Sequence, residues 1–313
     1  EGSVEEKEVV KAQALGLRAY YYFMLVNLYG EPYNYNKKAL GVPLKLTSAL
    51  LENGITRNTV EEVYTRIVID LEQASALFGK YSKRRGDFRI NGTATDILLS
   101  RVYLYMEEWD RAIEAANRAI KTAEGLTDYT TVEAGNQFYM TTYELSEVEW
   151  LFDMSITNFP FVPSGDLLSK YTNGDKRETL WFNANGSISK RAQKSGWGPN
   201  RTIRISEAYL NRAEALVLSQ NANIGEALAD LNELRRHRIV GYQDISISDA
   251  TILLGEIRVE RRLELCFDGH RWFDLRRYGM PSISHDYKLK KNDAWVTYVL
   301  KEKDPLYTLP IPR

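Results

Sequence analysis

Proline is distributed unevenly along this chain, and its distribution limits where helices can form. The nine prolines leave two long stretches without this residue, 44–159 and 200–280. Proline in a helix interior removes a backbone hydrogen bond and clashes with the preceding turn. We therefore expect helices inside these two stretches, and turns or irregular segments where the prolines gather.

Apolar residues recur at helical spacing before the first proline and inside both proline-free stretches. The first pattern, spaced by four, three, four and three residues and ending at Gly30, consists of Leu15, Ala19, Tyr22, Val26 and Tyr29. The next helix begins with a capping-box sequence, in which Thr59 caps the helix and Glu62 reaches back to the cap. Further helices are expected around 98–105, 109–120, 203–218, 224–238 and 251–268, and a strand at 147–156.

Three pairs of these helices look like one repeated unit. Segment 94–123 has small residues where two helices would cross and a short turn between them, which is typical of tetratricopeptide (TPR) repeats of about 34 residues. Segment 203–238 shows the same pattern with a longer turn, and 8–78 would be a third pair, split by an insertion. We predict one domain over residues 1–313.

Two insertions interrupt the helical pattern, at 31–58 and 135–200. Loops longer than about 12–15 residues are uncommon and usually have a function. The predicted fold class is therefore mainly all-α, a TPR-like helix-turn-helix scaffold with little β-structure and with long irregular loops on the ligand side.

The overall composition excludes several classes of function. With 41 basic and 42 acidic residues, the net charge is −1, so the chain lacks the basic surplus that nucleic-acid binding requires. Its single cysteine, Cys266, excludes an intrachain disulfide. The three histidines, His237, His270 and His285, lack metal-ligand spacing, and we expect no metal and no cofactor. The longest uncharged apolar run, 19–26, is far shorter than the ~20 residues that span a bilayer.

Several motifs, in the same order along the chain, resemble the SusD/RagB family, the surface nutrient-binding lipoproteins of Bacteroidota. The most specific are ERRLEL at 260–265 and GHRWFDLRR at 269–277. Asp268 stands where the family usually has glutamate before Gly-His-Arg. The other matching segments are 17–20, 28–30, 94–120, IRISEAYLNRAEA at 203–215, and Pro-Ile-Pro at 310–312.

The resemblance implies a function, a partner and a location. It implies a helical scaffold whose loop-rich face captures an oligosaccharide or, in some members, a peptide. It also implies a SusC-like TonB-dependent transporter as partner, over which the protein acts as a lid. Family members usually begin with a lipidated cysteine on the outer-membrane surface. We expect membrane attachment only through such an N-terminal lipid anchor, which this sequence does not contain.

The richest cluster of charged residues, 256–277, allows an enzymatic alternative. Glu260 and Glu264 are four residues apart on one helical face, as a catalytic pair of a glycoside hydrolase could be. However, six arginines interleave with the five carboxylates of this stretch and would lower their pKa values rather than raise one. We therefore assign a structural role, without catalysis, to this motif, in which His270 would cap a helix or join the ion pairs. Its members are Glu260, Arg261, Arg262, Glu264, Gly269, His270, Arg271 and Asp274.

Aromatic side chains in the two insertions are the better candidates for function. A sugar ring needs a flat aromatic surface surrounded by amides or charged groups. Trp181 and Trp197, flanked by glycine and asparagine, are the predicted stacking surface. The further candidate ligand contacts are Tyr33, Tyr35, Tyr171 and Asn183. The alternative for each of these aromatic residues is that it anchors a long loop to the scaffold.

Taken together, the sequence predicts a binding protein that is not an enzyme. It would capture an oligosaccharide or peptide and deliver it to the transporter. The main alternative is a TPR-type adaptor that binds a protein or peptide and no glycan. A glycoside hydrolase is disfavoured by the arginines around Glu260 and Glu264.

Overall fold

The computed structural model describes residues 1–50, 54–81, 89–123, 125–133, 162–183, 188, 190, 203–288, 290 and 292–312. Within these ranges the fold is mainly helical, which confirms the predicted class: eleven α-helices accompany one two-stranded sheet. The strand expected at 147–156 and most of the insertion at 135–200 lie outside the described residues.

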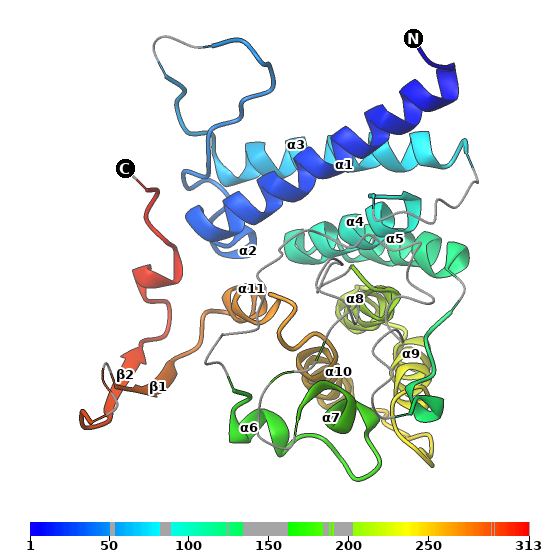
Figure 1. The fold of residues 1–313 in the computed structure, drawn as a ribbon, viewed down its shortest axis with the longest axis vertical. Coiled ribbons are helices and arrows are strands. Elements are labelled where there is room, and N and C mark those ends of the chain that lie inside the picture. Colours follow the sequence, from blue (N-terminus) through cyan, green and yellow to red (C-terminus); the bar gives the residue numbers. More distant parts are fainter. Residues whose placement is uncertain are drawn as a thin grey trace.

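The helices follow one another along the chain in the order shown in Figure 1. The first seven are α1 (Val4–Tyr29), α2 (Tyr33–Asn36), α3 (Val60–Phe78), α4 (Gly92–Met106), α5 (Trp109–Thr122), α6 (Gly165–Leu168) and α7 (Lys176–Trp181). The remaining elements are α8 (Ile205–Leu218), α9 (Ile224–Arg236), α10 (Ala250–Glu264), α11 (Arg271–Arg277), β1 (Ile283–Tyr287) and β2 (Val296–Leu300). Among the described residues, 3-10 turns lie at Tyr129–Thr131 and Pro305–Tyr307.

The long helices pack as successive pairs. Helix α1 lies along α3, α4 along α5, and α8 along α9, while α3 contacts α4 and α5 contacts α8 to join the pairs (Figure 1). These pairs coincide with the three segments that the sequence pattern singled out. Their assignment to TPR-like units stays a prediction.

Local signals fix several helix ends. Thr59 and Glu62 form the predicted capping box: the Glu62 backbone N–H donates to Thr59 Oγ1 at 3.2 Å, and the Thr59 N–H donates to Glu62 Oε2 at 2.8 Å. Helix α10 ends at Glu264, before the predicted end at 268. The reason is that Phe267 and Gly269 adopt left-handed backbone conformations, with φ of 63° and 87°, which a helix cannot continue.

The main hydrophobic core lies between the paired helices. Helix α5 contributes four alanines that are completely buried against α4 and α8: Ala112, Ala115, Ala116 and Ala119. Small side chains let helix axes approach closely. A second, smaller core lies around α6, α7 and the end of α10, and includes Trp181, Tyr171 and Phe182.

The C-terminal part forms an antiparallel hairpin that the sequence analysis did not anticipate. In β1 and β2, Ile283 pairs with Leu300 and Tyr287 with Val296. Almost all side chains of both strands are exposed. After the hairpin the chain returns to the helices, where the Leu309 N–H donates to the Leu28 carbonyl at 2.9 Å and the ring of Tyr307 stacks on Trp272 with centroids 5.0 Å apart.

Candidate functional site

Glu264, at the end of α10, lies at the centre of a buried group of arginines. Arg204 Nη1 donates to Glu264 Oε1 at 2.7 Å, and Arg238 donates to both carboxylate oxygens at 2.9 and 3.0 Å. Arg177 Nη1 adds a bond of 3.0 Å. Burial alone would raise the pKa of the Glu264 carboxyl, but the charges of Arg238 and Arg204 outweigh it and hold the pKa well below its usual range.

Glu260, one turn earlier, is held in the same way. It accepts from Arg177 Nη1 at 2.6 Å and from Arg235 Nε at 2.7 Å, and its side chain is 1% exposed. Burial raises and the two arginines lower the pKa of this carboxyl, and the net effect is a lower value. A general acid in glycoside cleavage needs a raised pKa and access to substrate. Glu260 and Glu264 have neither, so the geometry supports the structural interpretation.

A second buried network joins α8, α10 and α11. Arg261 Nε lies 3.0 Å from both oxygens of Asp274, and Arg277 Nε lies 3.0 Å from one of them. Arg277 also donates to both oxygens of Glu214, at 2.9 and 2.7 Å. Burial opposes ionisation of Glu214, yet the Arg277 charge lowers its pKa to about 2. These paired forks fix the three helices relative to one another.

The remaining motif residues are divided between surface and interior. Arg262 reaches the exposed Asp166 on α6 at 2.6 Å, and Gly269 supplies the left-handed turn before α11. Burial lowers the pKa of Arg271, which stands at the start of α11. His270 is buried and makes no side-chain cap bond, and burial followed by the Arg101 charge lowers its pKa far below the usual value. His270 therefore stands at the N-cap position of α11, as expected of a helix cap, but makes no side-chain bond to that helix, and its membership of the ion pairs stays a prediction.

Two of the predicted ligand contacts lie in the second core and offer no stacking surface. Trp181 is 0% exposed; Lys190 Nζ lies 4.1 Å from its ring centroid, and Tyr129 meets its edge. Tyr171 is also buried, and its hydroxyl donates to the Leu263 carbonyl at 3.1 Å. Both side chains anchor the segment around α6 and α7 to α10, which was the alternative that the sequence left open.

The other predicted contacts have different surroundings. Tyr35 on α2 is 55% exposed, whereas Tyr33 is half-buried with its ring 4.8 Å from that of Tyr64. Asn183, just after α7, is exposed, and Trp197 lies outside the described residues. Helices α2 and α7 occupy separate ends of the helical stack (Figure 1), so the structure does not bring Tyr35 and Asn183 together.

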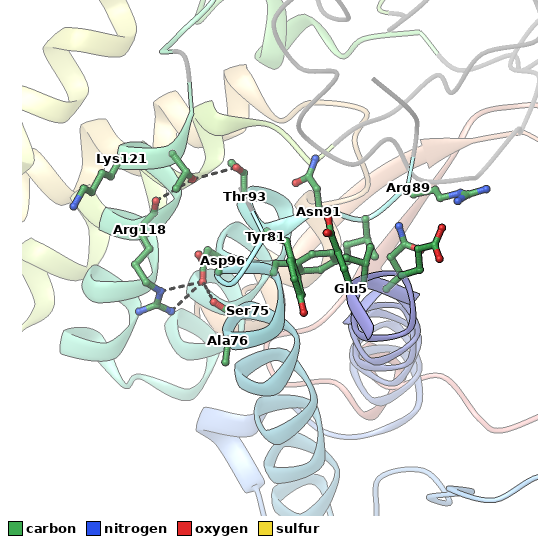
Figure 2. Close-up of a pocket in the computed structure, with 18 of the residues that line it drawn as sticks. Glu5, Ser75, Ala76, Tyr81, Arg89, Asn91, Thr93, Asp96, Arg118 and Lys121 are labelled. Carbon is green, nitrogen blue, oxygen red and sulfur yellow. Dashed lines mark hydrogen bonds and ion pairs between the residues drawn. The ribbon is translucent and has the colours of Figure 1, made fainter. Parts of the chain in front are cut away.

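A pocket of about 1100 Å³ opens where the ends of four helices meet. The N-terminal part of α1, the C-terminal end of α3, the start of α4 and the end of α5 line it (Figure 2). Its polar wall includes Asp96, whose Oδ1 accepts from Ser75 Oγ at 2.8 Å and from Arg118 Nε at 3.1 Å. Burial raises the pKa of Asp96, and the Arg118 charge opposes that rise only in part.

Two further residues of this pocket are held in place by bonds to neighbours. The Tyr81 hydroxyl donates to Glu8 Oε2 at 2.6 Å, and that bond raises the pKa of the phenol. Asn91 caps α4, accepting from the Ala94 N–H at 2.9 Å. Sequence reasoning missed this pocket because its walls come from four separate helices, and no local pattern marks them as neighbours.

The described ranges were also searched for metal sites and for membrane-spanning helices. Within them, no group of three or more histidine, cysteine or carboxylate side chains is placed to hold a metal ion. Nor does any described helix combine the length and the apolar character needed to cross a bilayer.

Two segments of the chain, one N-terminal and one C-terminal, match family profiles. Residues 1–104 match a profile described as "Starch-binding associating with outer membrane", and residues 164–309 match one described as "SusD family". No protein with a curated function matches the chain.

Solved structures are similar over nearly the whole chain. A SusD superfamily protein from Bacteroides vulgatus is 25% identical with a TM-score of 0.74, over 100% of this chain and 76% of that one. A SusD superfamily protein from Bacteroides thetaiotaomicron is 28% identical with a TM-score of 0.70, over 89% of this chain and 69% of that one. A putative sugar binding protein from Bacteroides vulgatus is 28% identical with a TM-score of 0.71, over 98% of this chain and 75% of that one. The resemblance seen in the sequence is thus confirmed, and the chain belongs to the SusD/RagB family, a carbohydrate-binding family associated with the outer membrane.

Proposed function

We propose that this protein captures an oligosaccharide at the cell surface and delivers it to a SusC-like TonB-dependent transporter in the outer membrane. The observation that carries this proposal is the family match of both parts of the chain, one of them to a starch-binding profile. Delivery requires release, so the protein should bind its ligand with modest affinity.

The described carboxylate clusters support binding rather than hydrolysis. Glu260 and Glu264 are paired with arginines, buried, and held ionised by those charges. A labelled oligosaccharide incubated with the protein should therefore stay intact. Product formation that Glu260→Gln abolishes would contradict this part of the proposal.

Of the ligand contacts predicted from the sequence, Tyr35 and Asn183 keep exposed side chains, and we retain both as candidates, with the half-buried Tyr33 beside Tyr35. An exposed ring can stack on the C–H face of a sugar. Trp197 stays a candidate on sequence grounds alone.

A glycan array followed by titration calorimetry tests the proposed function. We expect the wild-type protein to retain a subset of the glycans, and Tyr35→Ala to bind them more weakly if α2 is part of the ligand face. Tyr21→Ala, which removes a comparably exposed tyrosine from α1, is the matched control. Failure of the wild-type protein to bind any glycan would refute carbohydrate capture.

Transfer to a transporter needs a separate experiment. The full-length precursor, expressed with a SusC-like transporter, should fractionate with the outer membrane and co-purify with the transporter in mild detergent. Recovery of the protein apart from the transporter would argue against delivery while leaving glycan binding intact.

The alternative function, a TPR-type adaptor for proteins or peptides, is favoured by the paired packing of α4 with α5 and of α8 with α9. A peptide array beside the glycan array separates the two functions. Selective retention of peptides with no retained glycan would favour the adaptor.

A further inference from the structure

The pocket between α1, α3, α4 and α5 combines the features of a binding site for an uncharged, hydroxyl-rich ligand. We propose that it holds part of a neutral oligosaccharide. This inference rests on the proposed function, carbohydrate capture, and adds a location and a ligand class to it. The pocket lies at the helix ends and includes none of the residues that the sequence singled out as ligand contacts.

The charges of the pocket favour a ligand without net charge. Three acidic side chains line it, Glu5, Glu6 and Asp96, and three basic ones balance them, Arg89, Arg118 and Lys121. A site for a phosphate or a uronic acid would be expected to show a surplus of basic groups. Equal numbers of the two signs suit hydroxyl groups, which both donate and accept hydrogen bonds.

The polar groups of the pocket are oriented before any ligand arrives. Arg118 and Ser75 both donate to Asp96, and the Thr93 and Thr122 hydroxyls lie 3.1 Å apart (Figure 2). Asp96 is only 7% exposed, so its orientation is also fixed by packing. Groups that are already oriented lose little conformational freedom when a ligand binds, which favours affinity.

Aromatic and apolar groups complete the lining. Phe78 and Tyr81, at the end of α3 and just beyond it, line the pocket, and the bond to Glu8 holds the Tyr81 ring in place. Aromatic rings provide a flat apolar surface for the C–H face of a sugar. The volume of about 1100 Å³ is slightly above the ~300–1000 Å³ usual for small-molecule sites, which leaves room for more than one sugar ring.

Filling the pocket is the direct test. Ala76, an exposed residue of α3 that lines it, can be replaced by tryptophan without disturbing the core. Ile69→Trp is the matched control, because Ile69 is exposed on the same helix two turns away and outside the pocket. Binding of a glycan retained by the wild-type protein is measured by calorimetry. We expect Ala76→Trp to weaken it about tenfold or more, a loss comparable to that of one aromatic contact, and Ile69→Trp to leave it unchanged.

Three variants at two positions identify the groups involved. Tyr81→Phe keeps the ring but loses the bond to Glu8, so its binding should lie between that of the wild type and that of Tyr81→Ala, which should bind about tenfold more weakly than the wild type. Asn91→Asp keeps the oxygen that caps α4 and removes the amide donor, so weaker binding without loss of thermal stability would assign that amide to the ligand.

The outcomes separate the location from the function. Glycan binding by the wild-type protein that survives Ala76→Trp and Tyr81→Ala unchanged overturns this site and leaves carbohydrate capture standing. Absence of glycan binding by the wild-type protein overturns both. Preference of the wild-type protein for acidic over neutral oligosaccharides overturns the assigned ligand class.

Discussion

Lys190 Nζ lies 4.1 Å from the centroid of the Trp181 ring, in the interior of the second core. The same ammonium group donates to the carbonyls of Glu264 and Cys266 at 2.9 and 2.8 Å, and to Asp268 at 2.7 Å. Burial lowers the pKa of Lys190, although the Asp268 charge opposes that shift. Trp181 therefore packs over the Lys190 ammonium group, which binds the backbone carbonyls at the C-terminal end of α10. This position gives the tryptophan a structural role.

Replacing Trp181 by alanine should destabilise the fold. We expect Trp181→Ala to lower the free energy of unfolding by about 3–5 kcal/mol, because it opens a cavity and uncovers Lys190. Urea denaturation followed by circular dichroism measures the loss. Trp295→Ala, at a tryptophan that is 66% exposed, is the control and should change stability by less than about 0.5 kcal/mol. An unchanged stability of Trp181→Ala would restore a ligand-binding role for this ring.

Acid should unfold the protein through its buried carboxylates. The pKa of Glu214 is about 2, and those of Glu260, Glu264 and Asp268 are also lowered, since their cationic partners outweigh burial. In the unfolded chain these groups titrate near their ordinary values, about 4. At a pH between the folded-state and unfolded-state pKa values, the unfolded chain binds more protons than the folded protein. The stabilisation that these carboxylates give is therefore fully present above about pH 5 and is lost as the pH falls toward 2.

Urea midpoints measured from pH 7 to pH 3 test this pH dependence. Burial raises the pKa values of Asp96 and Asp230, so these two carboxyls act in the opposite direction. They are outnumbered by the four carboxyls whose pKa values are lowered. Glu214→Gln should be destabilised at pH 7 and should show a shallower loss in acid. Glu302→Gln, at an exposed glutamate, should follow the wild-type curve. A wild-type midpoint that is constant down to pH 3 would contradict the ion-pair account.

Arg276 should be needed to hold the two ends of the chain together. Its guanidinium donates to the backbone carbonyls of Asn27 and Gly30, and to Thr308 Oγ1 at 3.1 Å. We expect Arg276→Met to lower the free energy of unfolding by about 2–4 kcal/mol, because it leaves the buried carbonyls at the end of α1 without this donor. Arg236→Met, which removes exposed ion pairs, should cost at most about 1 kcal/mol. Equal losses in the two variants would be inconsistent with this role.

The crossing of α5 with its neighbours should tolerate no added volume. Ala116 is completely buried, and we expect Ala116→Leu to lower the free energy of unfolding by about 1–3 kcal/mol through overpacking. Glu114→Leu adds a leucine to the exposed side of the same helix and serves as the control. Thermal unfolding of both variants compares the two positions, and a stable Ala116→Leu would show that the helices are less closely packed than described.

The sequence was most informative where local rules decide the structure. The Thr59–Glu62 capping box, the apolar face of α1 and the arginine-rich motif around Glu264 were predicted because spacing along one helix determines them. The burial of Trp181 could not be predicted, because it depends on how a loop segment folds back onto α10, far away in sequence. The exposed hairpin was missed for a different reason. Both faces of its strands are exposed, so no alternating apolar pattern marks them, and only the β-branched and aromatic composition of 296–300 indicates a strand.

The Arg276 contacts also have a consequence for the order in which the chain folds during synthesis. They join residues 249 and 246 positions apart, and the backbone bond between Leu309 and Leu28 spans almost the whole chain. Ribosomes release the N-terminal part first. Arg57 can bind the Tyr29 carbonyl early, but the carbonyls of Asn27, Leu28 and Gly30 acquire these donors only after residues 276 and 309 have emerged. Contacts of such high sequence separation slow folding. The α1–α3 pair of the nascent chain therefore keeps carbonyls without these donors at the end of α1 until the last part of the polypeptide has been synthesised.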